Sequence, residues 1–327
     1  MLDKPHSRTF ADINRAYASV FRPGRLSIGL VVPLETYDRS AVPTMENHLQ
    51  RAQLADELGF SSLWLRDVPF NVPSFGDAGQ IFDPFVYLGA LAVATQNIAL
   101  GVASIVLPLR HPAHVAKAAA SADALSGGRL LLGVASGDRP EEYPALNMTF
   151  DDRGERFREA MDYIRAVGRK THDFSNAYGR VSGGVDMLPK PAGGRLPLLI
   201  TGGSRQAPDW VAQNGDGWMT YPRDAALQKR IVEDYRTRIR EAELPDKPVM
   251  QSLYVDLLDE TEARPEPIHL GFRAGAGFLR RYLSEIEALG INHVALNLRF
   301  NGADTRTTMK RLADEVLPDF STWKDER

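Results

Sequence analysis

The segment Gly202-Gly203-Ser204-Arg205 follows the apolar run LPLLIT and has the residue types of an anion-binding turn. Glycines let backbone N–H groups approach a ligand closely, and the N-terminus of a helix favours a phosphate. Ser204 is in place to cap a helix that begins near Gln206, and Arg205 can add a charge-assisted contact. The segment is therefore a candidate phosphate site, with a tight turn before a helix as the alternative.

Two other apolar runs end in polar residues. Ser136 and Gly137, followed by Asp138 and Arg139, come after RLLLGVA and form either part of a ligand site or an ordinary turn. Asp67 comes after SSLWLR, where it either forms a local ion pair or accepts a hydrogen bond from a ligand N–H.

The stretch LPLRHPAH places His111 and His114 in an H-x-x-H pattern that suggests a metal. Zinc helices of the H-E-x-x-H kind need a spacing of four and a glutamate, and no third ligand is evident nearby. We therefore expect no metal, with Pro112 beginning a helix and His111 as its polar neighbour. The chain contains no cysteine, which excludes disulfides, Cys-ligated zinc and iron–sulfur centres.

The composition is that of a globular protein with a large core. Of the 327 residues, 43% are hydrophobic and 25% are charged, and the net charge is −3. No basic face for nucleic acid or an anionic membrane is evident, and no run approaches the roughly 20 apolar residues of a membrane span. The N-terminus lacks the apolar core of a signal peptide. We expect a cytoplasmic protein without nucleic-acid or membrane partners.

Short β-rich runs alternate with longer amphipathic segments along the chain. Eight such runs begin at Leu26, Ser61, Ile98, Arg129, Leu196, Asp216, Val249 and Ile291. Helices are expected over Thr44–Leu58, Asp83–Thr95, Val115–Leu125, Arg153–Val167, Gln206–Asn214, Ala225–Ala242, Arg273–Leu289 and Asp304–Glu315.

This alternation predicts a parallel α/β fold, specifically a (β/α)8 TIM barrel over residues 26–327 preceded by an N-terminal extension, residues 1–25. A doubly wound open sheet is the alternative, but no Gly-x-Gly-x-x-Gly turn follows the first strand. Insertions are expected after strands four and seven, at His172–Arg195 and Asp259–Phe272. In such barrels ligands bind at the C-terminal ends of the strands, where the candidate residues above lie.

The pattern of these motifs resembles a known family. The stretch IALGVASIVLPLRHPAHVAKAAASADALSGGRLLLGVASG is similar to the central signature of the bacterial luciferase-like flavin-dependent oxidoreductases. The similarity extends through GFSSLWLRD, EEYPALN, DDRGERFREAMDYIRA, LPLLITGGS and NGDGWMTYPRD, from about residue 26 to residue 320. The resemblance implies a (β/α)8 barrel that holds FMN, or the deazaflavin F420, at its C-terminal face.

The resemblance also implies roles for individual residues. Ser104 matches a position where many relatives have a non-proline cis peptide against the flavin ring, and Asp67 matches a polar position near that ring. Ser136 and Gly137, with Arg139 beside them, match the fourth-strand end near the ribityl chain and phosphate. Gly202, Gly203 and Ser204, followed by Arg205, match the phosphate-holding loop.

Two departures from the luciferase pattern bear on the reaction. Val68 stands where luciferases carry a histidine in the loop after strand two, and Ser136 stands where luciferase has a phosphate-binding arginine. Light emission and luciferase-type aldehyde chemistry are therefore not expected. Gly137-Asp138-Arg139 is instead similar to some F420-dependent reductases.

Three functions follow as hypotheses. The first is an FMN-dependent monooxygenase in which a separate flavin reductase supplies reduced flavin, which reacts with O2 and a small organic substrate. Asp67 and His111 are its candidate acid–base residues, and either Arg66 or Arg223 is a candidate receiver of an anionic substrate. The second is an F420-dependent hydride-transfer enzyme, and the third is a flavin-binding barrel without turnover. A homodimer is expected from the resemblance.

Overall fold

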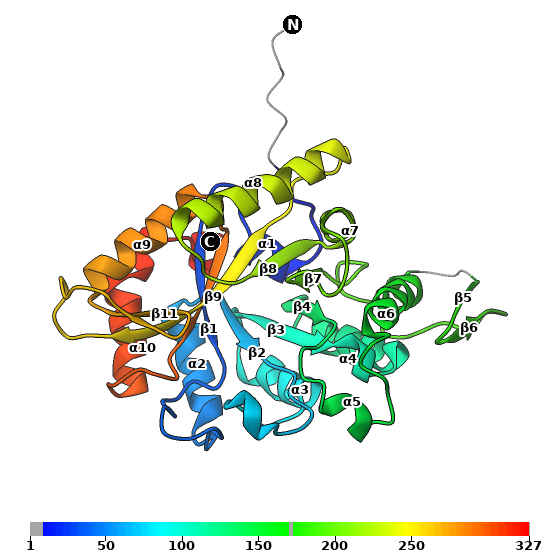
Figure 1. Cartoon of the computed structure of the whole chain (residues 1–327), viewed down its shortest axis with the longest axis horizontal. Helices are drawn as coiled ribbons and strands as arrows, with labels where there is room; N and C mark the ends of the chain where they lie inside the picture. Colours follow the sequence, from blue (N-terminus) through cyan, green and yellow to red (C-terminus); the bar gives the residue numbers. More distant parts are fainter. Residues whose placement is uncertain (1–8, 170–172, 327) are drawn as a thin grey trace, which may run out of the picture.

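Eight parallel strands close into a barrel in the computed structural model, which describes residues 9–169 and 173–326 (Figure 1). Each strand pairs with the next along the chain, β8 pairs with β9, and β12 closes the barrel by pairing with both β9 and β1. All eight predicted strands are present. Their bounds are β1 Ser27–Val31, β2 Ser62–Leu65, β3 Ala99–Val106, β4 Leu130–Ala135, β7 Leu198–Thr201, β8 Gly217–Thr220, β9 Val249–Leu257 and β12 His293–Asn297.

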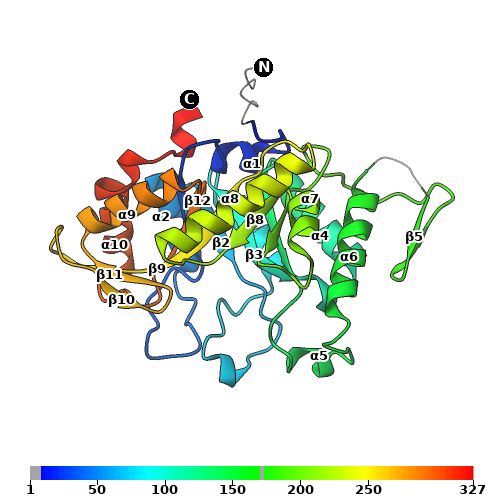
Figure 2. The ribbon, with the colours of Figure 1, turned by 45° about the horizontal axis from the view of Figure 1, so that its top comes forward.

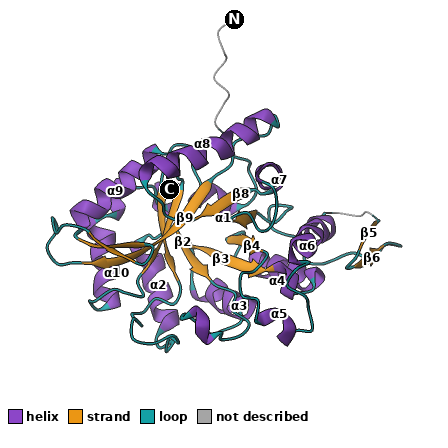
Figure 3. Ribbon diagram, viewed as in Figure 1, coloured by secondary structure: helices purple, strands orange, loops and turns teal. Residues whose placement is uncertain are grey.

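Helices surround the barrel, as Figure 3 shows with purple helices around orange strands. The eight predicted helices are confirmed, with ends shifted by a few residues: α2 His48–Leu58, α3 Pro84–Ala94, α4 Pro112–Leu125, α6 Arg153–Gly168, α7 Pro208–Asn214, α8 Ala225–Glu241, α9 Ala276–Ala288 and α10 Thr305–Glu315. Pro112 is the first residue of α4, as expected of a proline at a helix start. None of the helices in the described ranges is long and apolar enough to span a lipid bilayer.

Alternation along the strands divides the core into two parts. Leu63 and Leu65 of β2 belong to the large apolar cluster between strands and helices. Trp64, between them, belongs to a smaller cluster inside the barrel. By the same alternation, Arg66, two positions after Trp64, is on the inner face of the barrel, at the C-terminal end of β2.

A helix that the sequence did not suggest closes the N-terminal end of the barrel. This helix, α1 (Arg15–Val20), packs Tyr17 and Val20 against the interior cluster. The Tyr17 hydroxyl donates to the carbonyl of Asp216 at 2.6 Å, and the Asn14 side chain donates to the carbonyl of Leu130 at 2.8 Å. Of the predicted N-terminal extension, residues 1–8 lie outside the described residues, and the rest includes this closing helix.

A neutral hydrogen-bonded group lies just inside α1. The Trp64 indole N–H donates to Nε2 of His293 at 2.9 Å, so the ring proton of His293 is on Nδ1, which lies 2.7 Å from the Ser27 hydroxyl. Ser27 in turn donates to the carbonyl of Val20. Burial lowers the pKa of His293 to about 3, so the ring is uncharged at neutral pH.

Short hairpins occupy the two predicted insertions. The first contains β5 (Phe174–Asn176) paired with β6 (Gly179–Val181); its predicted start at His172 lies outside the described residues. The second contains β10 (Glu266–Ile268) paired with β11 (Gly271–Ala274). The prediction of a helix from Arg273 was wrong by three residues, because Gly271–Ala274 pairs in parallel with β9 before the helix begins.

Candidate active site at the C-terminal mouth of the barrel

The two ends of the barrel differ in what covers them. Figure 2 shows α1 at one end and, at the opposite end, the loops that follow β1 and β2 together with α5 (Glu142–Ala145). The second of these ends, which we call the mouth, is formed by the C-terminal ends of the strands. Parallel barrels bind their ligands there.

Ser104 lies inside the mouth, and the peptide bond between Ala103 and Ser104 is cis, as the resemblance implies. The Ser104 hydroxyl is hydrogen-bonded to the Thr201 hydroxyl and lies 3.7 Å from the sulfur of Met219. Both Ala103 and Ser104 are only half-buried. Side chains from β3, β7 and β8 therefore meet at a surface that remains open to a ligand.

The end of β4 forms a tight turn beside this surface. The carbonyl of Ser136 accepts a hydrogen bond from the Tyr143 hydroxyl of α5, and Gly137 has a positive φ of 79°. A Cβ on Gly137 would lie 2.7 Å from Cγ1 of Val106 and 2.8 Å from the Tyr143 oxygen. Glycine is required at position 137 for both conformational and steric reasons.

The turn after β7, residues 202–206, has left-handed backbone at Gly202, Ser204 and Arg205, with φ values of 55°, 43° and 61°. Ser204 does not cap a helix, so that part of the prediction was wrong. Its hydroxyl donates to the carbonyl of Thr201 at 2.8 Å, and α7 begins only at Pro208. The left-handed residues turn the chain back on itself before the helix can start.

Three consecutive backbone N–H groups of this turn, those of Gly203, Ser204 and Arg205, have no acceptor among the described residues. The turn lies against the N-terminus of α6, since the Gln206 side chain donates to the carbonyl of Gly154 at 2.7 Å. A Cβ on Gly154 would lie 2.9 Å from that of Arg205, so glycine permits this close approach. Free amides in left-handed turns and at helix N-termini are the groups that bind phosphate.

A guanidinium stands at the same helix end. Arg153, the first residue of α6, lies 3.4 Å over the ring of Phe150 and donates from Nη1 to the Phe150 carbonyl at 2.7 Å. Its Nε is buried and has no hydrogen-bond acceptor among the described residues. We call the turn 202–206 with Arg153 and Gly154 the amide pocket; its donors fit a phosphate ester.

Asp67 is fully engaged in holding the end of β3. Its carboxylate accepts hydrogen bonds from Nη2 and Nε of Arg110, at 2.7 and 3.0 Å, and from the Val106 N–H at 3.1 Å. Arg110 also pairs with Asp83 at 2.9 Å, and the Asp67 side chain has no exposed surface. Of the alternatives drawn from the sequence, the ion pair is the observed one. A catalytic role for Asp67 stays a prediction.

His111 lies on the outer side of the barrel. Its Nδ1 accepts from the Ala113 N–H at the start of α4, and its Nε2 lies 3.2 Å from the Tyr178 carbonyl in the β5–β6 hairpin. Its ring packs edge-on against those of Tyr163 and Tyr178. The structure does not bring His111 together with Ser104, and its catalytic role also stays a prediction. No group of three metal-ligating side chains occurs within residues 9–169 and 173–326.

Sequence reasoning missed Asp77 and Arg299, which together with Arg66 hold the loop after β2 over the mouth. Asp77 of this loop pairs with Arg66 at 2.6 Å and with Arg299, which follows β12, at 2.9 Å. The Tyr37 hydroxyl and the Gly79 N–H donate to its other oxygen, at 3.1 and 2.9 Å. Although burial alone would raise it, these cations and donors hold the pKa of Asp77 below its usual range. The barrel rule applied to the end of β12 would have indicated Arg299.

Arg139 joins this group from the loop after β4. It donates from Nη2 to the carbonyl of Asp77 at 3.2 Å and lies 4.3 Å over the ring of Phe75. Burial and the nearby charge of Arg66 lower its pKa, and burial raises the pKa of the adjacent Glu142. Arg139 therefore contacts the mouth, but on the side of the β2 loop and not on that of the amide pocket.

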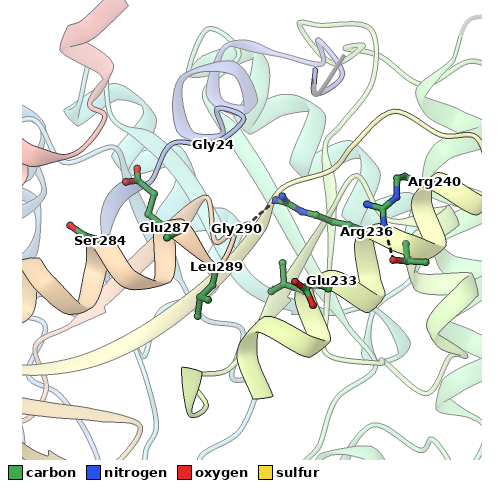
Figure 4. A pocket seen from close by; sticks show the side chains of 11 residues that line it. Gly24, Glu233, Arg236, Arg240, Ser284, Glu287, Leu289 and Gly290 are labelled. Carbon is green, nitrogen blue, oxygen red and sulfur yellow. Dashed lines mark hydrogen bonds between the residues drawn. The ribbon is translucent and has the colours of Figure 1, made fainter. Parts of the chain in front are cut away.

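A surface cavity of about 730 Å³ lies between α8 and α9, next to Gly24 (Figure 4). Its charged side chains stabilise the fold: Arg236 donates to the Gly290 carbonyl at 2.8 Å, and Glu287 accepts from the Leu26 N–H at 2.6 Å. This cavity adjoins the N-terminal ends of β1 and β12. It is therefore not the place where a barrel of this kind binds its substrate.

Comparison with known sequences agrees with the resemblance seen in the motifs. The sequence model of the luciferase-like monooxygenase family matches residues 25–326. An uncharacterised protein of Mycobacterium tuberculosis strain H37Rv is 30% identical over 219 residues, which are 62% of this chain and 75% of that protein. The 4-hydroxyprotoasukamycin monooxygenase of Streptomyces nodosus subsp. asukaensis is 30% identical over 185 residues, 54% of this chain and 47% of that protein.

Solved structures share the fold at low sequence identity. The monooxygenase RslO1 of Streptomyces bottropensis superposes with a TM-score of 0.75 at 20% identity, covering 90% of this chain and 99% of its own. The oxygenating constituent of 3,6-diketocamphane monooxygenase from Pseudomonas putida, solved with FMN, superposes with a TM-score of 0.74 at 16% identity. The match covers 90% of this chain and 99% of that chain. An F420-dependent secondary alcohol dehydrogenase superposes with a TM-score of 0.73 at 18% identity, covering 89% of this chain and 98% of that chain.

Proposed function

The chain belongs to the luciferase-like monooxygenase family, and from that premise we propose that it is a monooxygenase using reduced FMN and O2 on a small organic substrate. The observation that carries the proposal is the amide pocket. Three backbone N–H groups without an acceptor in the described part of the chain, a helix N-terminus and the Arg153 guanidinium provide donors that a phosphate ester would satisfy.

The residues of the mouth fit the rest of a flavin nucleotide. Gly202 to Arg205 and Arg153 would hold the phosphate, and Ser136 and Gly137 at the end of β4 would lie toward the ribityl chain, whereas Arg139 faces the β2 loop. Ala103 and Ser104, half-buried on β3, would face the ring. When bound, reduced FMN would supply the electrons for insertion of one oxygen atom from O2 into the substrate.

The chain itself would position the substrate and exclude water. The loop over residues 69–83 lies across the mouth and is tied there through Asp77. Such a cover limits unproductive reaction of a reduced cofactor with solvent. Supply of reduced FMN by a separate reductase and assembly as a homodimer remain part of the proposal, the latter to be measured by sedimentation.

A second candidate is F420-dependent hydride transfer on the same barrel. It is supported by the Gly137-Asp138-Arg139 sequence and by the structural likeness to the F420-dependent alcohol dehydrogenase. F420 also carries a phosphate, so the amide pocket suits either cofactor. A flavin-binding barrel without turnover is the third candidate, motivated by Val68 in place of a histidine.

Fluorescence titration of the purified protein with FMN, riboflavin and F420 tests the proposal. We expect FMN to bind at least about tenfold more tightly than riboflavin, which lacks the phosphate. Reduced FMN should then consume O2 with transfer of oxygen to one member of a substrate panel. Tight binding of F420 without affinity for FMN would contradict the first candidate. Stoichiometric FMN binding without turnover on any substrate would favour the third.

A further inference from the structure

Three arginines from three different strand ends meet at the mouth. Arg66 follows β2, Arg139 follows β4 and Arg299 follows β12, and all three contact Asp77: two through its carboxylate and Arg139 through its backbone carbonyl. We call these three residues the arginine cluster. Alternation along β2 and β12 explains the placement of two of them, because Arg66 and Arg299 each follow an inward-facing residue by two positions.

The arginine cluster is one of the attachments of the β2 loop to the body of the barrel, beside hydrogen bonds from the Arg66 N–H to Gln80 and from the Ala78 N–H to the Ala41 carbonyl. Arg299 also donates to the Gly76 carbonyl at 2.9 Å, and Arg139 lies over the Phe75 ring of η1 (Pro73–Phe75). The Tyr37 hydroxyl reinforces the attachment by donating to Asp77. The Asp77 carboxylate is thus an anion held in a preformed arginine site.

The cluster carries three positive charges, and the Asp77 carboxylate pairs directly with only two of them, those of Arg66 and Arg299. Two other acids, Asp138 and Glu142, are near Arg139, but Asp138 is exposed, and Oε1 of Glu142 lies 3.8 Å from Nη1 of Arg139, too far for a hydrogen bond. Nη1 of Arg139 has no hydrogen-bond acceptor among the described residues, although Arg139 is only 6% exposed. A buried guanidinium without its full set of acceptors is costly, and an incoming anion would relieve that cost.

The cluster is close to the site proposed for the flavin ring but separate from the amide pocket. Leu65 pairs with Val102, so Arg66 lies level with Ala103 on the neighbouring strand. The amide pocket follows β7, and β3 and β4 stand between β2 and β7 in the barrel. An anion bound by Arg66 would therefore belong to a molecule beside the ring, and not to the phosphate of the same cofactor.

We propose that the arginine cluster recognises a carboxylate or sulfonate group of the substrate, and that Asp77 occupies the cluster until the substrate takes its place. The inference rests on the proposed function, because it places the substrate next to Ala103 and Ser104. The substrate class is then a small organic acid, oxidised at a carbon other than that of its anionic group. Exchange of Asp77 for the substrate anion releases the β2 loop and couples entry of the substrate to movement of the cover.

Binding of small fluorinated probes, followed by 19F NMR, tests the recognition of charge. We would titrate 4-fluorobenzoate, 4-fluorobenzenesulfonate and the neutral 4-fluorobenzamide into the protein, with and without FMN. At least one anion should bind about tenfold more tightly than the amide, and Arg66→Gln and Arg139→Gln should each remove the difference. Arg238→Gln on α8, which removes the same charge from an exposed pair with Asp234, is the matched control.

Asp77→Asn gives a change of opposite sign. Removing the competing carboxylate should strengthen anion binding about tenfold, whereas a purely structural Asp77 would leave it unchanged or weaken it. Hydrogen exchange supplies a second measurement that does not require intact arginine variants. In the wild type, the backbone amides of residues 74–80 should exchange faster when the anion is present. In Asp77→Asn, they should exchange fast even without the anion.

The outcomes separate this inference from the proposed function. Anion binding that depends on Arg66 without FMN supports the cluster even if the flavin titration fails. If the protein binds FMN but binds the benzoate, the sulfonate and the benzamide with equal affinity, the proposed anion recognition is wrong and the flavin function still stands. If Arg66→Gln or Arg139→Gln instead weakens FMN relative to riboflavin, the cluster holds the cofactor phosphate and the inference is wrong.

Discussion

The two ends of this barrel satisfy their polar groups in different ways. At the N-terminal end, His293, Ser27 and Trp64 form a neutral group in which each donor has a buried acceptor. At the mouth, the arginine cluster shares one carboxylate, and three amides of the turn after β7 have no acceptor among the residues described. The described residues at the closed end satisfy one another's polar groups, whereas the mouth presents donors that the proposed ligands would satisfy.

The difference shows where stability and function are separated in the fold. Unsatisfied donors lower the stability of a protein, so they persist where binding requires them. Substitutions at the closed end should therefore change the free energy of unfolding and leave ligand affinity alone. Substitutions in the amide pocket should lower ligand affinity and leave the free energy of unfolding nearly unchanged. A substitution of Asp67 tests which of the two quantities changes at the rim of the mouth.

The largest effect is expected for Gly29→Ala on β1. A Cβ at position 29 would lie 2.7 Å from the Ser62 carbonyl oxygen and 2.9 Å from Nε2 of His293, inside a filled barrel. We expect the free energy of unfolding to fall by about 3 kcal/mol, measured by urea denaturation. Gly89→Ala on α3 is the matched control, because no atom of residues 9–169 or 173–326 lies within 4 Å of its added methyl group and alanine favours a helix. Equal stability of the two variants would show that the closed end is not tightly packed.

Asp67→Asn should have the next largest effect, although Asp67 lies at the mouth. The substitution removes the charge that Arg110 contacts with two nitrogens, and we expect a loss of about 2 to 3 kcal/mol in unfolding free energy. Asp83→Asn is the control, since Asp83 also pairs with Arg110 but its side chain is 41% exposed. A variant that keeps full stability and loses turnover would instead assign Asp67 to catalysis.

The buried His293 gives the closed end a pH dependence. Its pKa is about 3 in the folded protein and 6.5 ordinarily, so between these values only the unfolded chain takes up the proton. The contribution of the neutral His293 ring to the free energy of unfolding is therefore fully present above pH 6.5. It decreases as the pH falls, by about 2 kcal/mol at pH 5. The difference in unfolding free energy between wild type and His293→Gln should narrow by that amount from pH 7 to pH 5. An unchanged difference would mean that the ring is charged or exposed.

The smallest of these effects is expected in the amide pocket. Arg153→Gln should weaken FMN binding about tenfold, or about 1.4 kcal/mol, by removing a charged donor to the phosphate. Riboflavin affinity and the urea midpoint should hardly change. Arg230→Gln on the exposed side of α8 controls for net charge. A parallel loss of riboflavin affinity would place Arg153 at the ring and not at the phosphate.

Most of the fold could be predicted from the sequence because its signals are local. The periodicity of apolar residues indicated eight strands and eight helices, and glycines after helices such as α2 marked their ends. The helix α1 was missed because Arg15–Val20 is too short for a periodic pattern, and its burial depends on strands far away in the chain. The same reason explains β11, which pairs with β9.

The candidate site was predictable in position and less so in detail. The barrel rule indicated the C-terminal parts of the strands, and Ser104 lies near the end of β3 while Ser136 and Gly202 directly follow β4 and β7. It could not indicate that Asp77, from the middle of a loop, contacts arginines from three strands. Nor could it show that Asp67 is already paired with Arg110. Such pairings depend on distances between loops, which neighbouring residues in the sequence do not encode.

The position of α1 has a consequence for the order in which the chain folds. The Tyr17 hydroxyl binds the carbonyl of Asp216, 199 residues further along the chain, and Asn14 contacts Asp123. A ribosome must therefore add some 200 residues before the partner of Tyr17 exists, and closing so long a loop costs entropy that only the finished strands repay. One of the first segments to be synthesised is one of the last to dock, and it seals the barrel behind it.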